Sequence, residues 1–248
     1  MPAIHLPTIS TRAPKGLNKE KTKAITAKLI EELDDLQNLL YAESRHSVLI
    51  IVQGMDGSGK DGLVRDVFGK LNPQGVLVKS YKAPVAEELS HDFLWRIHQH
   101  APAKGMIQIF NRSHYEDIII TRVHKWCSDK LAKERMKAIN DFEELLTKHN
   151  NTHILKFYLH ISPEEQQLRL EERIKDPRKQ WKYNQNDLQE SKLWNLYMKM
   201  YEDCFTHCNK PSWQIIPSDQ NWYKDFLIAT ALHTLLNGLN MQYPGLKK

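Results

Sequence analysis

The sequence predicts an α/β fold, a three-layer sandwich in which helices cover both faces of a mainly parallel five-stranded sheet. Short apolar runs that are typical of buried strands alternate along the chain with stretches of helical periodicity. The most apolar of these runs, residues 48–52, ends at a glycine-rich loop. The length of 248 residues suits one domain, residues 1–248, that carries a small inserted module. Strands that alternate with helices form βαβ units, which give parallel sheets.

Composition excludes several classes of protein. Apolar residues make up 41% of the chain and charged residues 26%, which is ordinary for a globular domain. The 35 Lys and Arg against 30 Asp and Glu give a net charge of +5, a mild excess that would suit an anionic partner. Three cysteines are too few for a disulfide framework and favour a reducing compartment. With no apolar leader in residues 1–17 and no run of the ~20 apolar residues that a membrane span needs, we expect a cytoplasmic protein.

The elements are expected in the following order. Residues 1–17 carry three prolines and no periodicity, so they are predicted to form an extended or poorly ordered arm. An amphipathic helix over residues 19–44 follows. The apolar runs predict strands at 48–52, 76–78, 106–110, 154–161 and 213–216. The helical patterns between them predict helices at 61–71, 89–100, 113–126 and 141–149, and a last helix at 222–239.

A helical hairpin, residues 163–208, is predicted between the fourth and fifth strands, and we call it the lid. Its first helix has clear start signals: Ser162 as the N-cap, Pro163 at the first position and Glu165 to complete a capping box. This helix should end before Asp176-Pro177, because proline cannot continue it. The second helix is predicted over residues 187–208, and the tip between the two helices is basic and aromatic.

The loop Gly54-Met55-Asp56-Gly57-Ser58-Gly59-Lys60-Asp61-Gly62 is the most informative stretch of the sequence. Gly54 and Gly59-Lys60 fit the P-loop pattern G-x-x-x-x-G-K, and the loop follows a strand and opens a helix. Glycines let the backbone aim several N–H groups at a phosphate, and the helix N-terminus and the lysine add positive charge. We therefore expect phosphate contacts from Gly57, Ser58, Gly59, Lys60, Asp61 and Gly62.

Other interpretations of the same loop remain open. Gly57-x-Gly59-x-x-Gly62 also fits the dinucleotide fingerprint, which requires an acidic residue about 20 positions later. That region offers Lys79 and Lys82, which would suit a 2′-phosphate, whereas a lysine inside the loop favours phosphoryl chemistry. The third possibility is a strand–turn–helix without a ligand.

Two acidic residues of the loop are unusual. Asp61 stands where a P-loop usually has the Ser or Thr that contacts magnesium. Asp56 lies inside the loop, where a negative charge among phosphates needs a cation beside it. We interpret Asp56 as a magnesium ligand. The alternative is a turn residue that bonds to its own backbone.

A second site is expected where residues 109–117 pass from a strand into a helix, because ligands of such sheets bind at the carboxyl ends of strands. Asn111 occupies the place of the usual magnesium-binding carboxylate, so Glu116 or Asp117 would supply the charge, although Glu116 also fits a capping box with Ser113. Arg112 is expected to contact a phosphate. Arg122 either does the same or pairs with Asp117 on a solvated face.

Basic residues gather on the lid. Positive charge brought over transferring phosphates stabilises the charge that spreads over their oxygens. Arg173 is our choice for this catalytic role, and Arg178 and Lys179, with Lys82 before the lid, are further candidates for phosphate contacts. The alternative is a solvated face paired with Glu171 and Glu172.

Several blocks together resemble the polyphosphate kinase 2 family: GMDGSGKDG, LNPQGV (71–76), ELSHDFLWR (88–96), IFNRSHYED (109–117) and RIKDPRKQWKY (173–183). The resemblance implies a P-loop kinase fold with a helical lid, and catalytic roles for Asp56, Lys60, Arg112 and Arg173. It also implies Mg²⁺, with Mn²⁺ as a possible substitute, and a homo-oligomer, a dimer or tetramer. Asn111 and Glu116 are similar to the branch that uses AMP and ADP, with Asp56, Glu116 and Asp117 as candidate metal ligands.

The expected function is magnesium-dependent, reversible transfer of the terminal phosphoryl group of inorganic polyphosphate to a nucleoside mono- or diphosphate, adenine being the favoured base. No general base is expected, because the acceptor is a phosphate oxygen that is already anionic. Two alternatives remain: a nucleoside monophosphate kinase that uses ATP, and a non-catalytic protein that binds polyanions. A nucleic-acid partner is not expected, because only the lid tip interleaves basic and aromatic residues.

Overall fold

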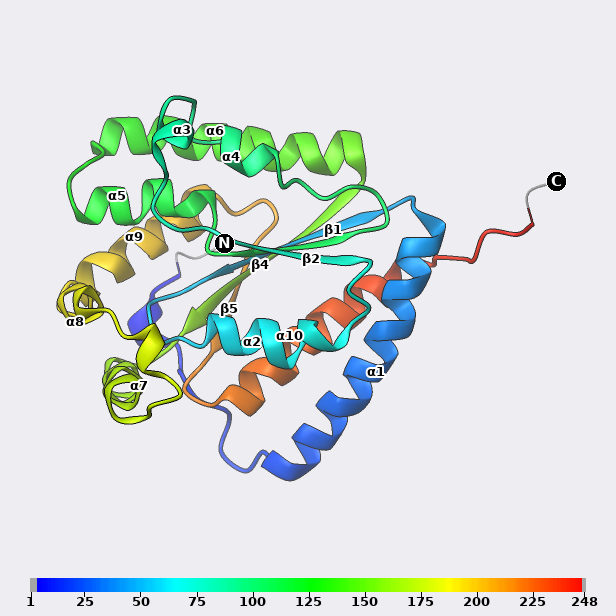
Figure 1. Ribbon diagram of the computed structural model, residues 1–248, viewed down its shortest axis with the longest axis horizontal. Helices are drawn as coiled ribbons and strands as arrows, with labels where there is room; N and C mark the ends of the chain where they lie inside the picture. Colours follow the sequence, from blue (N-terminus) through cyan, green and yellow to red (C-terminus); the bar gives the residue numbers. More distant parts are fainter. Residues whose placement is uncertain (1–3, 247–248) are drawn as a thin grey trace.

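The computed structural model describes residues 4–246 and contains one sheet of five parallel strands, so the predicted α/β class and strand number are confirmed (Figure 1). The strand order is β2-β3-β1-β4-β5, which makes β1 the central strand. All seven residues of β1 are buried, as its unbroken apolar run requires. The strands are β1 (Ser47–Gln53), β2 (Val76–Ser80), β3 (Ile107–Asn111), β4 (Thr152–His160) and β5 (Trp213–Pro217).

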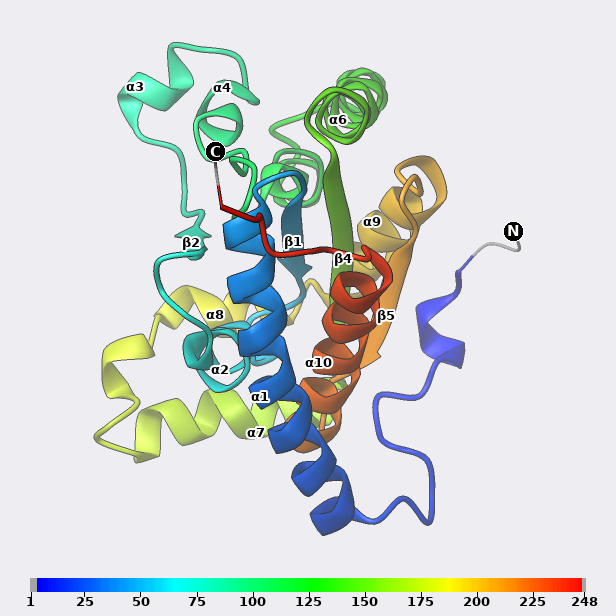
Figure 2. The ribbon, with the colours of Figure 1, turned by 90° about the vertical axis from the view of Figure 1, so that its right-hand side faces the viewer.

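Helices cover both faces of the sheet (Figure 1, Figure 2). Alternate residues of β1 point to opposite faces of the sheet and belong to two apolar clusters. Val48, Ile50 and Val52 belong to the first cluster, and Leu49 and Ile51 belong to the second. The first cluster is closed by α1 (Lys19–Glu43), α2 (Lys60–Asp66), η2 (Phe68–Lys70) and α10 (Asn221–Gly238). The second is closed by η3 (His114–Ile118), α4 (Trp95–His98), α5 (Ile120–Val123), α6 (Asp129–Asn150) and α9 (Trp194–His207).

The helices differ from the sequence prediction in several places. Helix α6 begins at Asp129 and is therefore longer than the predicted 141–149. The predicted helix 61–71 is α2 followed by η2, and the predicted helix 113–126 is η3 followed by α5. The predicted helix 89–100 holds only the short α4 and the last residue of α3 (Ala86–Leu89). The predicted helix 187–208 is two helices, α8 (Gln185–Ser191) and α9, and the first half of the lid is α7 (Pro163–Lys175) followed by η4 (Gln180–Lys182).

The N-terminal arm is anchored to the rest of the domain. Residues 4–17 contain no strand or α-helix, which fits the extended form of the prediction, and residues 1–3 lie outside the described part. Leu6 is fully buried in the second apolar cluster and begins the short helix η1 (Leu6–Thr8). Its backbone N–H donates to Glu202 Oε1 of α9 at 2.7 Å. Ile4, two residues earlier, packs against the same cluster. Two apolar side chains between prolines are too few to show a periodicity, so the burial of Leu6 could not be predicted from its own segment.

An ion pair lies in the core between β4 and α6. Lys156 and Glu143 are both fully buried, with Nζ and Oε2 2.7 Å apart. The Tyr115 hydroxyl donates to Glu143 Oε1 at 2.8 Å, and His114 Nε2 lies 3.2 Å from the same oxygen. These hydrogen bonds satisfy charges that would otherwise be costly to bury.

Candidate functional site

The candidate site lies at the carboxyl edge of the sheet. Because all five strands are parallel, their carboxyl ends meet there, as Figure 1 shows on the side where α7 and α8 are drawn. The P-loop, residues 54–59, leaves β1, Arg112 follows β3, and Ser162 and Asp219 follow β4 and β5. This edge is where ligands bind in sheets of this type.

The backbone of the P-loop requires its glycines. Gly54, Gly57 and Gly59 have φ angles of 152°, 84° and 93°, which side chains with a Cβ rarely adopt. A Cβ on Gly54 would also lie 2.9 Å from the Leu159 carbonyl oxygen, so the loop rests directly on β4. These three glycines therefore allow the tight turn that the sequence pattern predicted. Gly62 lies in α2 and does not have a positive φ.

Lys60 points back into the P-loop. Its ammonium donates to the carbonyl oxygens of Gly54 at 2.6 Å and Met55 at 3.1 Å. Burial, together with the nearby charge of Arg112, lowers the pKa of Lys60 to about 8, although Asp56, Glu116 and Asp61 act in the opposite direction. The loop therefore holds a buried cation that is close to losing its proton at neutral pH.

Arg112 and Asp56 form an ion pair across the site. Burial opposes ionisation of Asp56, but the charges of Lys60, Arg112 and Arg173 outweigh it and hold its pKa below the usual value. Arg112 has a φ of 62°, in the left-handed region where residues other than glycine are rare. Such strain clusters at functional sites, and here it aims the guanidinium at the P-loop.

The lid contributes a second ion pair. Arg173 of α7 donates to Asp187 of α8 at 2.6 Å, and both side chains are largely buried. Burial raises the pKa of Asp187, as does the charge of Asp56, while Arg173 lowers it. The sequence analysis did not include Asp187, because its link to the P-loop exists only when the lid is folded.

Asp61 joins three parts of the site. Its Oδ1 accepts from Asn111 Nδ2 at 3.0 Å, and its Oδ2 accepts from Lys182 Nζ of the lid tip at 2.8 Å. Partial burial opposes ionisation, but the hydrogen bonds from Lys182 and Asn111 lower the pKa of Asp61 to about 2. Asp61 therefore connects α2 to β3 and to the lid.

Glu116 and Asp117 lie in different surroundings. Burial raises the pKa of Glu116, although Arg112 and Lys60 stabilise its charge. The carboxylate of Asp117 pairs with Arg96 at 3.4 Å. In residues 4–246 no group of three or more His, Cys, Asp or Glu side chains is placed to hold a metal ion, so the three candidate ligands do not form such a set.

Three basic residues expected to contact phosphate have acidic partners in this structure, and their phosphate contacts stay a prediction. Arg122 pairs with Asp203 at 2.6 Å and with Asp129 at 2.9 Å, and not with Asp117. Arg178 pairs with Asp176, and Lys179 pairs with Glu172, one of the two partners that the alternative of a solvated face names. The side chain of Lys82 is exposed near the end of β2.

Two further cationic side chains donate hydrogen bonds to carbonyl oxygens of the P-loop. Arg169 of α7 donates to the Gly57 carbonyl at 2.9 Å and to the Ser218 carbonyl at 2.8 Å. Lys224 of α10, almost fully buried, donates to the Gly59 carbonyl at 3.1 Å. These hydrogen bonds fix two carbonyl groups of the loop. Neither residue was assigned a role from the sequence, because each contacts a loop that lies more than 100 residues away along the chain.

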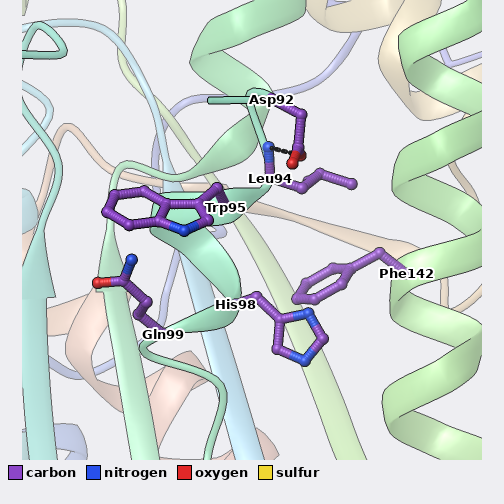
Figure 3. A pocket seen from close by; sticks show the side chains of 6 residues that line it. All are labelled: Asp92, Leu94, Trp95, His98, Gln99 and Phe142. Carbon is purple, nitrogen blue, oxygen red and sulfur yellow. Dashed lines mark hydrogen bonds between the residues drawn. The ribbon is translucent and has the colours of Figure 1, made fainter. Parts of the chain in front are cut away.

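A cavity outside this edge is lined by Asp92, Trp95, His98 and Gln99 with Leu94 and Phe142 (Figure 3). It measures about 510 Å³ and lies between α4 and α6, with no P-loop or lid residue among those that line it. Its walls are mainly aromatic and apolar, which does not suit a polyanion. The carboxyl edge, where the P-loop and the basic side chains meet, remains the candidate site for a phosphate ligand.

A glycine loop with a buried lysine, at the mouth of the central strand of a parallel sheet, defines the class of P-loop kinases. The model of the family described as polyphosphate kinase 2 matches residues 16–245. The chain belongs to the polyphosphate kinase 2 family, and the resemblance found in the sequence is confirmed.

Relatives and a solved structure support this assignment. The chain is 44% identical to the AMP/ADP-polyphosphate phosphotransferase of Meiothermus ruber, over 94% of this chain and 88% of the relative. It is 39% identical to the ADP-polyphosphate phosphotransferase of Rhodopseudomonas palustris, over 92% and 83%. The crystal structure of polyphosphate kinase 2 from Arthrobacter aurescens is similar with a TM-score of 0.93 at 38% identity, covering 100% of this chain and 90% of that one.

Within residues 4–246, none of the helices combines the length and the apolar character that crossing a membrane requires.

Proposed function

We propose that the chain transfers the terminal phosphoryl group of inorganic polyphosphate to AMP or ADP, and that the reaction is reversible. The observation that carries the proposal is the convergence of Lys60, Arg112 and Arg173 on Asp56 at the mouth of the central strand. The donor and the acceptors are those in the names of the relatives, the AMP/ADP-polyphosphate phosphotransferase of Meiothermus ruber and the ADP-polyphosphate phosphotransferase of Rhodopseudomonas palustris. The lid, residues 163–208, is proposed as a module of the same domain.

The transfer needs positioning and positive charge rather than a protein nucleophile. An oxygen of the acceptor's terminal phosphate attacks the terminal phosphorus of the chain, and the bond to the next bridging oxygen breaks. The shortened chain leaves with that electron pair, and no proton has to move because both oxygens are anionic. Lys60 and Arg112 would stabilise the charge on the transferring group, and Arg173 would add to it from the lid. The lid would also exclude water.

The residues present fit a divalent cation. Mg²⁺ is usually bound through one or two carboxylates together with substrate phosphates, rather than by a cage of protein ligands. Asp56 offers a carboxylate that stays ionised, and Glu116 lies close enough for their charges to interact. When bound there, the cation would neutralise phosphate charge during the transfer. Asp117, paired with Arg96, is not part of this proposal. The predicted dimer or tetramer stays a prediction.

The test is a panel of donors and acceptors. The purified protein is incubated with Mg²⁺, with long-chain polyphosphate or ATP as donor and AMP or ADP as acceptor, and the products are separated. We expect ADP and ATP from polyphosphate. Lys60→Ala should lower the rate at least a hundredfold, because it removes a charge that acts on the transferring group. Lys175→Ala, which removes an exposed lid charge paired with Glu171, is the matched control. Turnover with ATP alone would refute polyphosphate as donor.

A further inference from the structure

The N-terminal arm meets the lid and the end of β5 at one buried carboxylate. Asp219 Oδ2 accepts from the Thr11 hydroxyl at 2.8 Å and from the Ser162 hydroxyl at 3.0 Å. Its Oδ1 accepts from the Ser162 backbone N–H at 2.8 Å. A backbone hydrogen bond joins the same two segments: the Asp219 N–H donates to the Thr11 carbonyl oxygen at 3.0 Å. The Asp219 side chain is only 3% exposed, so these partners replace water almost completely.

This junction sets the start of the lid. Ser162 is the N-cap of α7, and its hydroxyl accepts from the Glu165 N–H. Asp219 therefore holds the residue that fixes where α7 begins and in which direction it runs. One or two turns later, Gln166 donates to the Asp56 carbonyl at 2.8 Å and Arg169 to the Gly57 carbonyl at 2.9 Å. A shift of α7 would move both contacts to the P-loop.

The arm is held at further points beside this junction. The Ile9 carbonyl lies 3.2 Å from His160 Nε2 at the end of β4, and the Ala13 N–H donates to Gln220 Oε1 at 2.9 Å. Figure 2 shows the arm, in dark blue, on the β5 side of the sheet before it turns into α1. No hydrogen bond or ion pair in residues 4–246 joins the arm directly to the P-loop.

We propose that arm residues 9–13 act as a brace: through Asp219 they hold α7 in the position that keeps the P-loop ready to bind polyphosphate. Thr11 and Asp219 are thus positioning residues, remote from the phosphates, for the transfer proposed above, on which this inference rests. If the brace is loosened, fewer molecules have the competent arrangement, so the substrate must shift the population when it binds. That raises KM and leaves the rate of the saturated enzyme nearly unchanged.

The test compares three single variants of the full chain. Thr11→Val removes the hydroxyl that donates to Asp219 and keeps the shape of the side chain. Thr11→Ser keeps the hydroxyl and is the conservative rescue. Thr8→Val is the matched control, because the Thr8 hydroxyl donates only to the His5 carbonyl within the arm. For Thr11→Val we expect a KM for polyphosphate about three to ten times that of the parent, as the loss of one hydrogen bond allows, with kcat within about twofold.

Hydrogen exchange separates positioning from general stability. In Thr11→Val, exchange should rise in residues 163–170 and 54–59 and remain unchanged in β1 and β3, while Thr11→Ser and Thr8→Val match the parent. Equal KM values for Thr11→Val and Thr11→Ser would overturn the brace. So would faster exchange throughout the chain with a lower melting temperature, because that shows a merely structural role. If the parent makes no product from polyphosphate, the proposed function fails, whereas the exchange comparison still decides about the brace.

Discussion

Raising the pH from 7 to 9 should lower kcat/KM for polyphosphate about tenfold, because Lys60 loses its proton. An exposed lysine has a pKa of 10.5 and stays charged at pH 9, but burial among loop carbonyls lowers the pKa of Lys60 to about 8. One pH unit above its pKa, only about a tenth of a group is still protonated. A neutral amine cannot attract a phosphate oxygen as an ammonium does.

The assay is the pH dependence of kcat/KM, which reports ionisations of the free enzyme. It is measured from pH 6.5 to 9.5 at constant ionic strength, with saturating acceptor and polyphosphate varied. The control is Lys60→Arg on the same substrates, because a guanidinium stays charged over this range. Any effect of pH on the substrates then appears in both proteins. A parent profile that is flat up to pH 9.5, or the same decline in Lys60→Arg, would refute the role of the lowered pKa.

The same pKa has an effect on stability with a defined sign. The folded protein releases the Lys60 proton near pH 8, and the unfolded chain keeps it up to about pH 10.5, so the unfolded state binds more protons in between. The free energy of unfolding should therefore rise with pH across this window, and about 2 kcal/mol of the rise falls between pH 7 and pH 9.5. Denaturant titrations at pH 7 and pH 9.5 measure the change, and Lys60→Met, which cannot titrate, should lack this contribution.

Three substitutions test the other ion pairs. Arg112→Ala should lower kcat about a hundredfold or more with an unchanged circular dichroism spectrum, because it removes charge that would act on the transferring group; a kcat within threefold of the parent would contradict the assignment. Lys182→Ala should raise KM for polyphosphate less than about fivefold, because its pair with Asp61 is partly exposed. If the two residues act as a pair, Lys182→Ala should have no further effect on KM in a chain that already carries Asp61→Asn. Effects of the two substitutions that simply add would argue against the pair. Lys156→Met should cost about 3 kcal/mol or more of the free energy of unfolding, because it leaves Glu143 buried without its partner. Its folded fraction should keep the parent kcat, and a folded but inactive variant would show that this pair serves catalysis.

The parts that the sequence predicted are those whose signal is local. A run of β-branched residues such as 48–52 can hardly be anything but a buried strand, and the glycines of the P-loop are needed for φ angles that few other residues adopt. The observed start and end of α7 agree with the prediction. The residues that determine them, the N-cap Ser162, Pro163 and the Asp176-Pro177 pair, all lie in or next to the helix itself. Local chemistry thus predicted the elements that carry the site.

The parts that were missed depend on partners far along the chain. Arg122 looks like a phosphate ligand in its own segment, but its partner Asp203 is 81 residues away. Leu6 lies in a short segment without periodicity, and its backbone N–H donates to Glu202, which is 196 residues away. Helix α6 is different, because a local signal existed: Ala132, Met136 and Ile139 recur at helical spacing and are all buried. The charged residues between them concealed that pattern.

Under the proposed function, the ion pair of Arg112 and Asp56 would link phosphate binding to the binding of a cation. The two side chains are only partly exposed, and the carboxylate stays ionised because Lys60, Arg112 and Arg173 surround it. If Arg112 turns to a phosphate oxygen, Asp56 loses its hydrogen-bonded partner in a place where an unpaired charge is costly. A divalent cation held by Asp56 would remove that cost and would supply further positive charge for phosphate oxygens. Each ligand would then strengthen the binding of the other by the same factor, because coupling between two binding equilibria is reciprocal. An aspartate inside a phosphate loop is unfavourable by charge alone, and it would become favourable if polyphosphate and the cation bound together.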